Sequence, residues 1–296
     1  MDTKPDLSTL SEAELARMEK DIARKYIGGV PWMMVVWALG NLGLWLSLWP
    51  LVMMGIMPLW LGFIIATINV TLSYLPSHEA QHSNIGKPGT KWRWLNELVG
   101  NVSTIPLVFP YRVLRLTHMK HHAHTNDPED DPDYFNKADN WILSAWNTIK
   151  AKQPGYEDRY GIALEKMGDT PEVRAAILEA VIWRLGHIVI LCALAWNGFA
   201  LEAFFLWFLP KHLGSIYIIA FLSWAPHHPF SEKGRYRDTR AWRLGGGMGI
   251  WNIISLGMQY HTVHHLHPAI PLFRNGPAYW EMRDVLMARG LRNDGL

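Results

Sequence analysis

Hydrophobic residues in this chain gather into long runs, and most charged residues fall between the runs. The first run covers about Gly28–Trp49 and the second about Val52–Leu75, with Pro50 expected to break the helix between them. A helix needs roughly 20 apolar residues to cross a bilayer, so each run is long enough to span one. Almost no polar sequence separates the two runs, which predicts a tight helical hairpin. Its return helix leads directly into Ser77–His82.

A second apolar block covers about Ala175–Ala225 and is long enough for two more spans. Asn197 and Gly198 are the expected turn between them, because both residue types favour turns. Lys211 and His212 fall inside the fourth span. Charged groups at that depth are costly unless they reach the interface or face protein, so the sequence leaves their placement open.

Shorter elements are expected around these hairpins. Ser11 and Glu14 predict a capping box that opens a short surface helix before the first span. Two apolar stretches, Trp92–Phe109 and Met248–Tyr260, are too short or too interrupted to span, so we expect helices at the membrane surface or beneath a cap. Residues 125–170 are polar and are expected to form a loop.

The pattern predicts an all-α, polytopic membrane protein with about four transmembrane helices in two hairpins, interfacial helices and a histidine-rich cap. We expect one domain over residues 1–296. Its parts are an N-terminal helix (1–27), the first hairpin (28–75), a first cap segment (76–174), the second hairpin (175–226) and a second cap segment (227–296).

The positions of the charged residues predict how the chain is oriented in the membrane. Lysine and arginine precede the first span and follow the second and fourth, whereas the two short turns carry neither residue. The positive-inside tendency therefore places both termini and every long loop in the cytoplasm. The formal net charge of +2 gives no indication of a nucleic-acid partner.

The supply of metal-binding side chains is unusual. The single cysteine, Cys192, lies in an apolar run, so internal disulfides and four-thiolate iron–sulfur or zinc sites are excluded. Histidine is abundant, with 14 copies. Any metal ion must therefore be held mainly by groups other than thiolates.

Eight of the histidines form three short motifs. His78 and His82 are four residues apart, and two HxxHH triplets follow later in the chain. Positions i, i+3 and i+4 share one face of a helix, so each motif can direct two or three imidazoles at one point. The triplets are His118, His121 and His122, and His261, His264 and His265.

These motifs favour a pair of redox metal ions. Imidazole suits iron, zinc, copper and nickel, and eight nitrogen ligands are too many for one ion. A catalytic zinc usually takes three protein ligands and a water. Carboxylate-bridged di-iron bundles use two Glu-x-x-His motifs and two further glutamates, whereas this sequence has a single such match, Glu79–His82. A metal transporter is the rival outside the enzymes. It should carry its ionisable ligands at mid-membrane, whereas these motifs all lie on the predicted cytoplasmic side.

The motifs HEAQH, HMKHH and HTVHH, in this order and flanking two hairpins, resemble those of the membrane fatty acid desaturase and hydroxylase superfamily. The resemblance covers about Gly28–Pro271. It implies a histidine-bound di-iron centre with O2 as co-substrate, and it makes all eight histidines of the three motifs metal ligands.

The resemblance also implies a ninth ligand at the end of the fourth span, often within an NxxxH motif. The match is Ser223-x-x-x-His227, in which serine replaces asparagine, and we favour His227 over His228. The segments HMKHHAHTNDPEDDPD and HHLHPAIP are similar to those of short bacterial desaturase-like proteins and bacterial carotenoid hydroxylases. That similarity implies a bacterial inner membrane.

The leading hypothesis is therefore a fatty acyl desaturase. A carotenoid (beta-carotene) ring hydroxylase or ketolase is the alternative, followed by an alkane-type hydroxylase. No flavin fingerprint or haem domain is recognisable, so electrons should come from a ferredoxin-type or similar carrier and its reductase. Lys233, Arg235 and Arg237 are candidates for steering an acidic carrier, or serve only to set the topology.

Several further residues are expected to support the motifs. Glu79 and Asp127 are candidate hydrogen-bond acceptors for ligand imidazoles, and Asp130, Asp131 and Asp133 are expected to belong to the loop. The other histidines, His124, His187, His212 and His267, are expected to pack or to form hydrogen bonds, with ligation as the alternative for His124 and His267.

Overall fold

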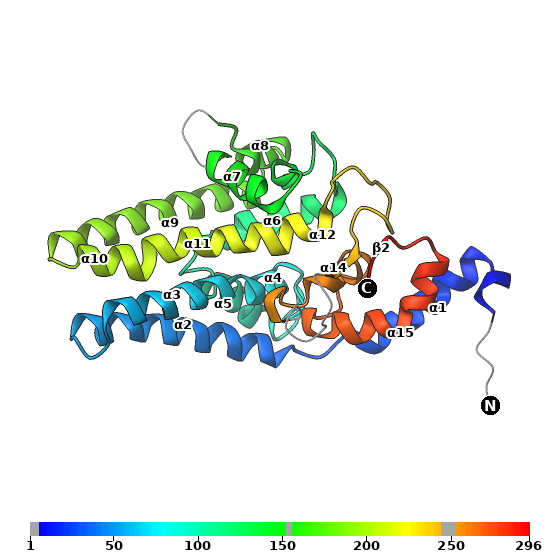
Figure 1. Ribbon diagram of the computed structural model, residues 1–296, viewed down its shortest axis with the longest axis horizontal. Helices are drawn as coiled ribbons and strands as arrows, with labels where there is room; N and C mark the ends of the chain where they lie inside the picture. The colour runs from blue at the N-terminus through cyan, green and yellow to red at the C-terminus, as the bar shows by residue number, and fades with distance from the viewer. Residues whose placement is uncertain (1–5, 152–155, 244–252) are drawn as a thin grey trace.

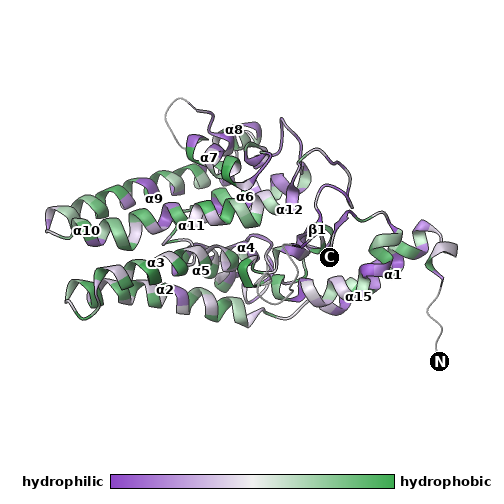
Figure 2. Ribbon diagram, in the orientation of Figure 1, coloured by the Kyte–Doolittle hydropathy of each residue, from purple (hydrophilic) through white to green (hydrophobic). Residues whose placement is uncertain are grey.

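The computed structural model describes residues 6–151, 156–243 and 253–296. Within them, four helices are long and apolar enough to cross a membrane: Trp32–Met53, Leu59–Gln81, Pro171–Trp196 and Ala200–His227. They lie side by side along the long axis of the molecule (Figure 1) and are mostly hydrophobic (Figure 2). The prediction of an all-α protein with four spans in two hairpins is confirmed.

The first hairpin differs from the prediction at its turn. Pro50 lies inside α2 (Trp32–Met53) and does not end it. A proline removes one backbone hydrogen bond, yet the helix continues for three residues beyond Pro50. The chain turns instead at Gly55, whose φ of +70° suits glycine, and α3 (Leu59–Leu72) begins after Pro58.

The second span continues beyond its predicted end at Leu75. α3 passes into α4 (Tyr74–Gln81), so the first histidine motif lies on the last turns of a spanning helix. Polar side chains join this span to the first. Asn41 Nδ2 donates to the Asn69 carbonyl oxygen and to Ser73 Oγ, both at 2.9 Å, and Asn69 Nδ2 donates back to the Asn41 carbonyl oxygen at 2.7 Å.

The second hairpin turns where predicted, because Asn197 caps α9 (Pro171–Trp196) and Gly198 has a φ of +89°. The fourth span is built from α10 (Ala200–Ala203), α11 (Leu209–Ile218) and α12 (Ala225–His227), joined by the π-helical segments η3 (Phe204–Phe208) and η4 (Ile219–Trp224). Lys211 and His212, whose placement the sequence leaves open, are both half-buried beside Phe208.

The cap contains more helix than predicted. Residues 125–170 were expected to form a loop, yet they include η2 (Tyr134–Asn136), α7 (Trp141–Ala151) and α8 (Arg159–Lys166). Trp92–Phe109 is helical only over α5 (Arg93–Val102), and turns follow it. The start of the predicted helix Met248–Tyr260 lies outside the described residues, and its end forms η5 (Met258–Tyr260).

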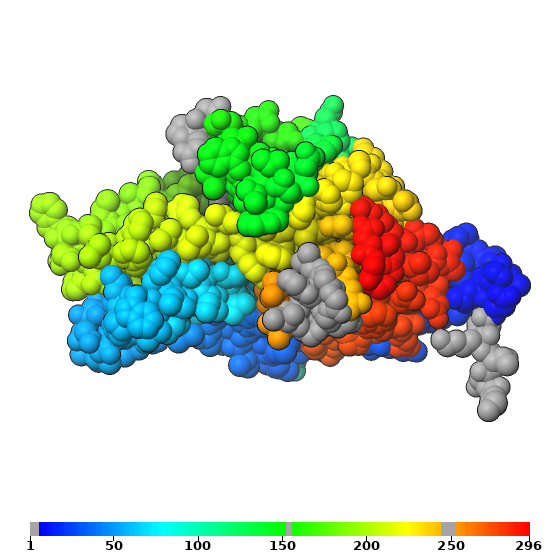
Figure 3. Space-filling model, in the orientation of Figure 1, coloured from blue at the N-terminus to red at the C-terminus, as the bar shows by residue number. Residues whose placement is uncertain are grey.

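The remaining cap elements gather at one end of the spans (Figures 1 and 3). α1 (Glu12–Tyr26) starts with the predicted Ser11–Glu14 capping box and packs against α15 (Asn275–Ala288). The short elements are η1 (Leu7–Thr9), η6 (Leu272–Arg274) and a parallel pair of two-residue strands, β1 (Ala241–Trp242) and β2 (Asn293–Asp294). α6 (Tyr111–Ala123) and α14 (His261–Leu266) carry the other two histidine motifs.

Candidate metal centre

All three histidine motifs lie at ends of helices that meet at the same end of the bundle. His78 is on the last turn of α4, and His82 caps that helix. His121 and His122 are on the last turn of α6, whereas His261 opens α14. The helical spacing of each motif therefore directs its imidazoles toward one region, as the sequence predicts.

Seven of the nine predicted ligands form two close groups. In the first group, ligand atoms of His78, His82, His118 and His264 all lie within 4.8 Å of one another. In the second, those of His121, His227 and His265 do so. Two neighbouring positions are thus each surrounded by imidazole nitrogens.

The other two predicted ligands lie beside these groups. His122 Nε2 is 3.1 Å from His118 Nε2 and 3.0 Å from His264 Nε2, and the His122 ring stacks on the His265 ring with centroids 4.1 Å apart. His261 Nε2 is 3.0 Å from His265 Nε2. His122 therefore lies between the two groups, and His261 adjoins the second.

The contacts among the ring nitrogens fit metal ligation better than a hydrogen-bond network. The nitrogen of a neutral imidazole has one in-plane position, which holds either a proton or a lone pair. His118 Nε2 faces two nitrogens, at 2.8 Å in His82 and 3.1 Å in His122. These contacts cannot all be hydrogen bonds at once. Lone pairs that converge on a cation resolve the conflict.

Burial adds two further signs that the donor set suits metal ions. Burial and the neighbouring imidazoles hold the pKa values of His118, His264 and His265 well below 6.5, so these rings are neutral and can donate lone pairs. The buried Nδ1 atoms of His261 and His264 have no hydrogen-bond partner among the described residues. These rings are therefore oriented by packing.

His121 is the ligand candidate with a carboxylate behind it. Its Nδ1 lies 2.8 Å from Asp131 Oδ1, and both side chains are buried. Burial lowers the pKa of His121, but the Asp131 carboxylate outweighs this effect and raises it to about 9. Asp131 also accepts hydrogen bonds from the backbone amides of Asn126 and Asp133, each at 2.8 Å. Asp131 is thus fixed in place to orient the His121 ring.

The expected role of Asp127 is therefore wrong. Its carboxylate accepts hydrogen bonds from the backbone amides of Glu129 and Asp130 and pairs with Lys233 at 3.1 Å, and these contacts lower its pKa to about 2. Asp127 closes the turn of the loop. The left-handed backbone of Asn126 (φ +62°) reverses the chain, and Asp131, five residues further on, then points back toward His121.

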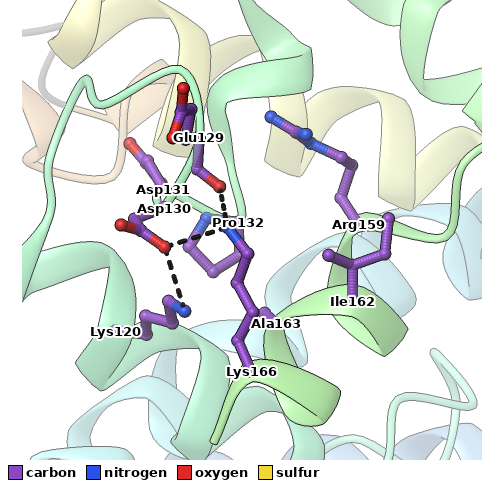
Figure 4. Close-up of a pocket in the computed structure, with 9 residues that line it drawn as sticks. All are labelled: Lys120, Glu129, Asp130, Asp131, Pro132, Arg159, Ile162, Ala163 and Lys166. Atoms are coloured by element: carbon purple, nitrogen blue, oxygen red, sulfur yellow. Dashed lines mark hydrogen bonds and ion pairs between the residues drawn. The ribbon is translucent and has the colours of Figure 1, made fainter.

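Lysines from two helices hold the same loop from outside (Figure 4). Asp130 pairs with Lys120 on α6 at 3.4 Å and with Lys166 on α8 at 3.0 Å. Lys166 also donates to the Glu129 carbonyl oxygen at 2.8 Å. The loop that carries Asp131 is therefore attached both to the helix of the second motif and to α8.

The expected role of Glu79 is also wrong. Its carboxylate accepts hydrogen bonds from Asn84 Nδ2 at 2.8 Å and from the Leu272 backbone amide, and these partners take the place of an imidazole. Asn84 Nδ2 also donates to the Pro268 carbonyl oxygen at 3.0 Å. This set ties the first motif to the segment after the third.

The histidines outside the three motifs differ in whether they lie in the cluster. His227 lies in the second group, whereas His228 packs against the Trp224 ring, with centroids 4.8 Å apart. His187 packs against Trp207, and His124 is an exposed helix cap. The packing role expected for His187 agrees with its position, whereas His124 is exposed and does not show the packing expected of it.

His267 reveals a residue that the sequence reasoning missed. Its Nε2 lies 2.8 Å from Glu19 Oε1, and Glu19 is buried although it belongs to α1. Tyr236 and Arg289 also donate to Glu19, at 2.8 and 2.7 Å. A signal was present, because Glu19 is four residues after Leu15 and thus shares the apolar side of that helix.

Comparison with known proteins agrees with this geometry. The model of the family described as fatty acid desaturase matches residues 54–292. An sn-1 oleoyl-lipid 12-desaturase of Synechocystis sp. is 34% identical over 82 residues, which are 28% of this chain and 21% of that protein.

Two longer matches have lower identity. A beta-carotene ketolase of Paracoccus sp. is 26% identical over 68% of this chain and 71% of its own length. An sn-1 acyl-lipid omega-3 desaturase (ferredoxin) of Nostoc sp. is 22% identical over 70% of this chain and 60% of its own. The part of a relative that has no counterpart in this chain therefore ranges from about a third of the beta-carotene ketolase to about four fifths of the 12-desaturase.

Proposed function

Because the chain belongs to the fatty acid desaturase family, we propose that it is an O2-dependent membrane di-iron oxidoreductase acting on a lipid-like apolar substrate, in the first place as a fatty acyl desaturase. The observation that carries the proposal is the convergence of nine histidines at one end of four apolar helices, seven of them in two close groups and two beside these groups. Imidazole ligands without thiolates suit iron in redox chemistry.

The two groups divide the proposed ligands between two ions. The first ion would be held by His78, His82, His118 and His264, the second by His121, His227, His261 and His265, with His122 between them. When bound, the iron pair supplies the O2 chemistry that attacks an unactivated C–H bond. The protein contributes the imidazole ligands, and Asp131 orients the His121 ring.

The stoichiometry of desaturation determines which other reactants are needed. It removes two hydrogen atoms from neighbouring carbons, and O2 is reduced to two waters when two further electrons and two protons are supplied. The electrons would come from a ferredoxin-type carrier and its reductase, a partner that the printed name of the Nostoc relative supports. Lys233 and Arg237, which we considered for steering the carrier, pair with Asp127 and Glu232, so only part of their charge is available.

A carotenoid ketolase or ring hydroxylase is the second candidate. It is supported by the similarity to the beta-carotene ketolase of Paracoccus sp., which extends over more than two thirds of both chains. An alkane-type hydroxylase is the third candidate. A metal transporter is disfavoured because the histidines lie at one end of the spanning helices, whereas a transport site belongs near the bilayer midplane.

The proposal also covers the location of the protein in the cell and its orientation in the membrane. We propose a multi-pass protein of the bacterial inner membrane with both termini and the histidine cluster on the cytoplasmic side. The concentration of lysine and arginine in the long loops supports this orientation.

Product analysis tests the proposed function most directly. Cells expressing the chain are supplied separately with acyl lipids and with carotenoids, and lipids and pigments are profiled with and without O2. New double bonds in acyl chains are expected, and oxygenated carotenoids would favour the second candidate. The variant H121A should abolish either product, whereas H187A is the matched control because His187 packs on Trp207. Products that persist in H121A would overturn the proposal.

A further inference from the structure

The helix α7 presents its large apolar side chains outward. Ile142, Trp146 and Ile149 are 60%, 55% and 38% exposed. The opposite side of the helix is small and polar, since Ser144 and Thr148 are almost fully buried. A helix that covers the core of a water-soluble protein shows the reverse arrangement.

The polar side of α7 is already engaged by the protein. Thr148 Oγ1 donates to Asn136 Oδ1 at 3.3 Å, and Asn136 Nδ2 donates to Ser223 Oγ at 2.8 Å. Ser223 lies in η4, one turn before His227 at the end of the fourth span. In the segment before α7, the Ala138 carbonyl oxygen accepts a hydrogen bond from Trp224 Nε1 at 2.9 Å. α7 is therefore fixed against the histidine end of a spanning helix, and its large apolar side chains are exposed on the opposite side.

That apolar side resembles the surface of the spans and differs from that of its neighbour α8. On α9, Leu178 and Leu185 are exposed to 60% and 58%, which is the same range as Ile142 and Trp146. On α8, by contrast, the exposed residues include Glu165 and Lys166. Two adjacent cap helices thus present opposite surfaces, one suited to hydrocarbon and the other to water.

The ends of α7 fit the boundary of a bilayer. Lys137 precedes the helix and Lys150 lies in its last turn, where cations can reach lipid phosphates. Trp141 and Trp146 supply the aromatic residues that are enriched at membrane interfaces. Figure 1 draws α7 above the fourth span, and α7 contacts η4, the segment that joins α11 to α12.

We propose that α7 is a membrane-embedded interfacial helix, with Ile142, Trp146 and Ile149 in contact with lipid acyl chains and its polar side docked on η4. The segment between the second histidine motif and the third span is then anchored in the bilayer. The chain Thr148–Asn136–Ser223 extends that anchor to within one helical turn of His227. This proposal depends only on the membrane location of the protein, and it stands whatever the substrate is.

Spin labelling in lipid nanodiscs tests the proposal. Single cysteines are placed at Ile142, Trp146 or Ile149 in the full-length C192A protein, with L185C on α9 as the lipid control and E165C on α8 as the water control. Relaxation by dissolved O2, which concentrates in hydrocarbon, is compared with relaxation by a water-soluble nickel chelate. The three α7 labels should match the α9 label, with a high ratio of O2 to nickel accessibility.

Either of two other results would overturn the proposal. A low ratio, equal to that of the α8 label, would place α7 in water. Spin–spin broadening that disappears on dilution with unlabelled protein would show that a second copy covers the helix. Where a cysteine variant does not fold, the unmodified protein is irradiated in vesicles of phosphatidylcholine with an acyl-chain diazirine. Adducts should map to residues 141–149 and not to α8, and adducts on α8 alone would refute the proposal.

Discussion

Replacing Asp131 with asparagine should damage the proposed centre by releasing the His121 ring. The carboxylate accepts three hydrogen bonds, from His121 Nδ1 and from the backbone amides of Asn126 and Asp133, each at 2.8 Å. An asparagine has the same shape, but it replaces one acceptor oxygen by an NH2 donor. Whichever way the amide is turned, its nitrogen faces at least one of these N–H groups.

The size of the effect follows from burial. Both Asp131 and His121 are buried, so water cannot replace the lost acceptor. Leaving a buried donor unpaired costs about 1–3 kcal/mol, and more where a charge is lost. Loss of a hydrogen-bond partner behind a ligand histidine typically reduces metal affinity or activity about 10–100-fold. We expect D131N to fall within that range, well above the residual activity of H121A.

The assay compares bound iron per chain and product formation in D131N, D127N and H121A. D127N is the matched control, because Asp127 belongs to the same loop but holds only backbone amides and Lys233. It should retain bound iron and activity within about twofold, because its carboxylate has no contact with a ligand imidazole. Wild-type behaviour of D131N would refute the reasoning. Equal losses in D131N and D127N would mean that both variants act through loop folding.

Three further predictions follow from the structure. H227A should lose bound iron and activity as completely as H121A, whereas H228A should retain measurable turnover, because only His227 lies within the cluster; equal, mild losses would contradict this. Burial raises the pKa of Glu19, but this effect is outweighed by hydrogen bonds from His267 and Tyr236 and by the charge of Arg289, so the pKa lies below 4.5. The ionised Glu19 therefore stabilises the fold above pH 4.5, and this stabilisation is lost as the pH falls through the lowered pKa. Thermal unfolding should therefore show a smaller stability loss between about pH 6 and pH 3.5 in E19Q than in the parent protein, and an unchanged pH profile would refute this role of Glu19. In C192A cells, cysteines introduced near either terminus should react only with reagents that enter the cytoplasm, and labelling from outside would refute the proposed orientation.

The sequence predicted those features that depend on local periodicity. Long apolar runs predicted the four spans, and the spacing of four within each motif placed the imidazoles on one helical face. The errors in the first hairpin have a simple origin. Pro50 was treated as a helix end, although a proline near the last turn of a helix removes only one hydrogen bond, and the turn was formed by Gly55.

Features that depend on distant parts of the chain could not be predicted in this way. The choice between Asp127 and Asp131 depends on the left-handed turn at Asn126, and the partner of Glu19, His267, is 248 residues away. The helix α7 was missed for a different reason. Its apolar residues face outward, so the segment was interpreted within a polar loop, and only its docking on η4 reveals which face is buried.

The polar contacts around the cluster fix helix ends more than they fix individual rings. Glu79 and Asn84 bind the helix of the first motif to Leu272 and Pro268, beyond the third motif. Asp131 instead holds the His121 ring directly.

Other rings, such as those of His78 and His264, have a buried Nδ1 without a partner among the described residues and are held by packing alone. A metal pair would therefore find its donors positioned mainly by the junctions between helices. Substitutions at those junctions, although they touch no ligand, should disturb ligands from two motifs at once. This coupling distinguishes a centre built from helix ends from one built on a single loop, where each ligand depends on its own neighbours.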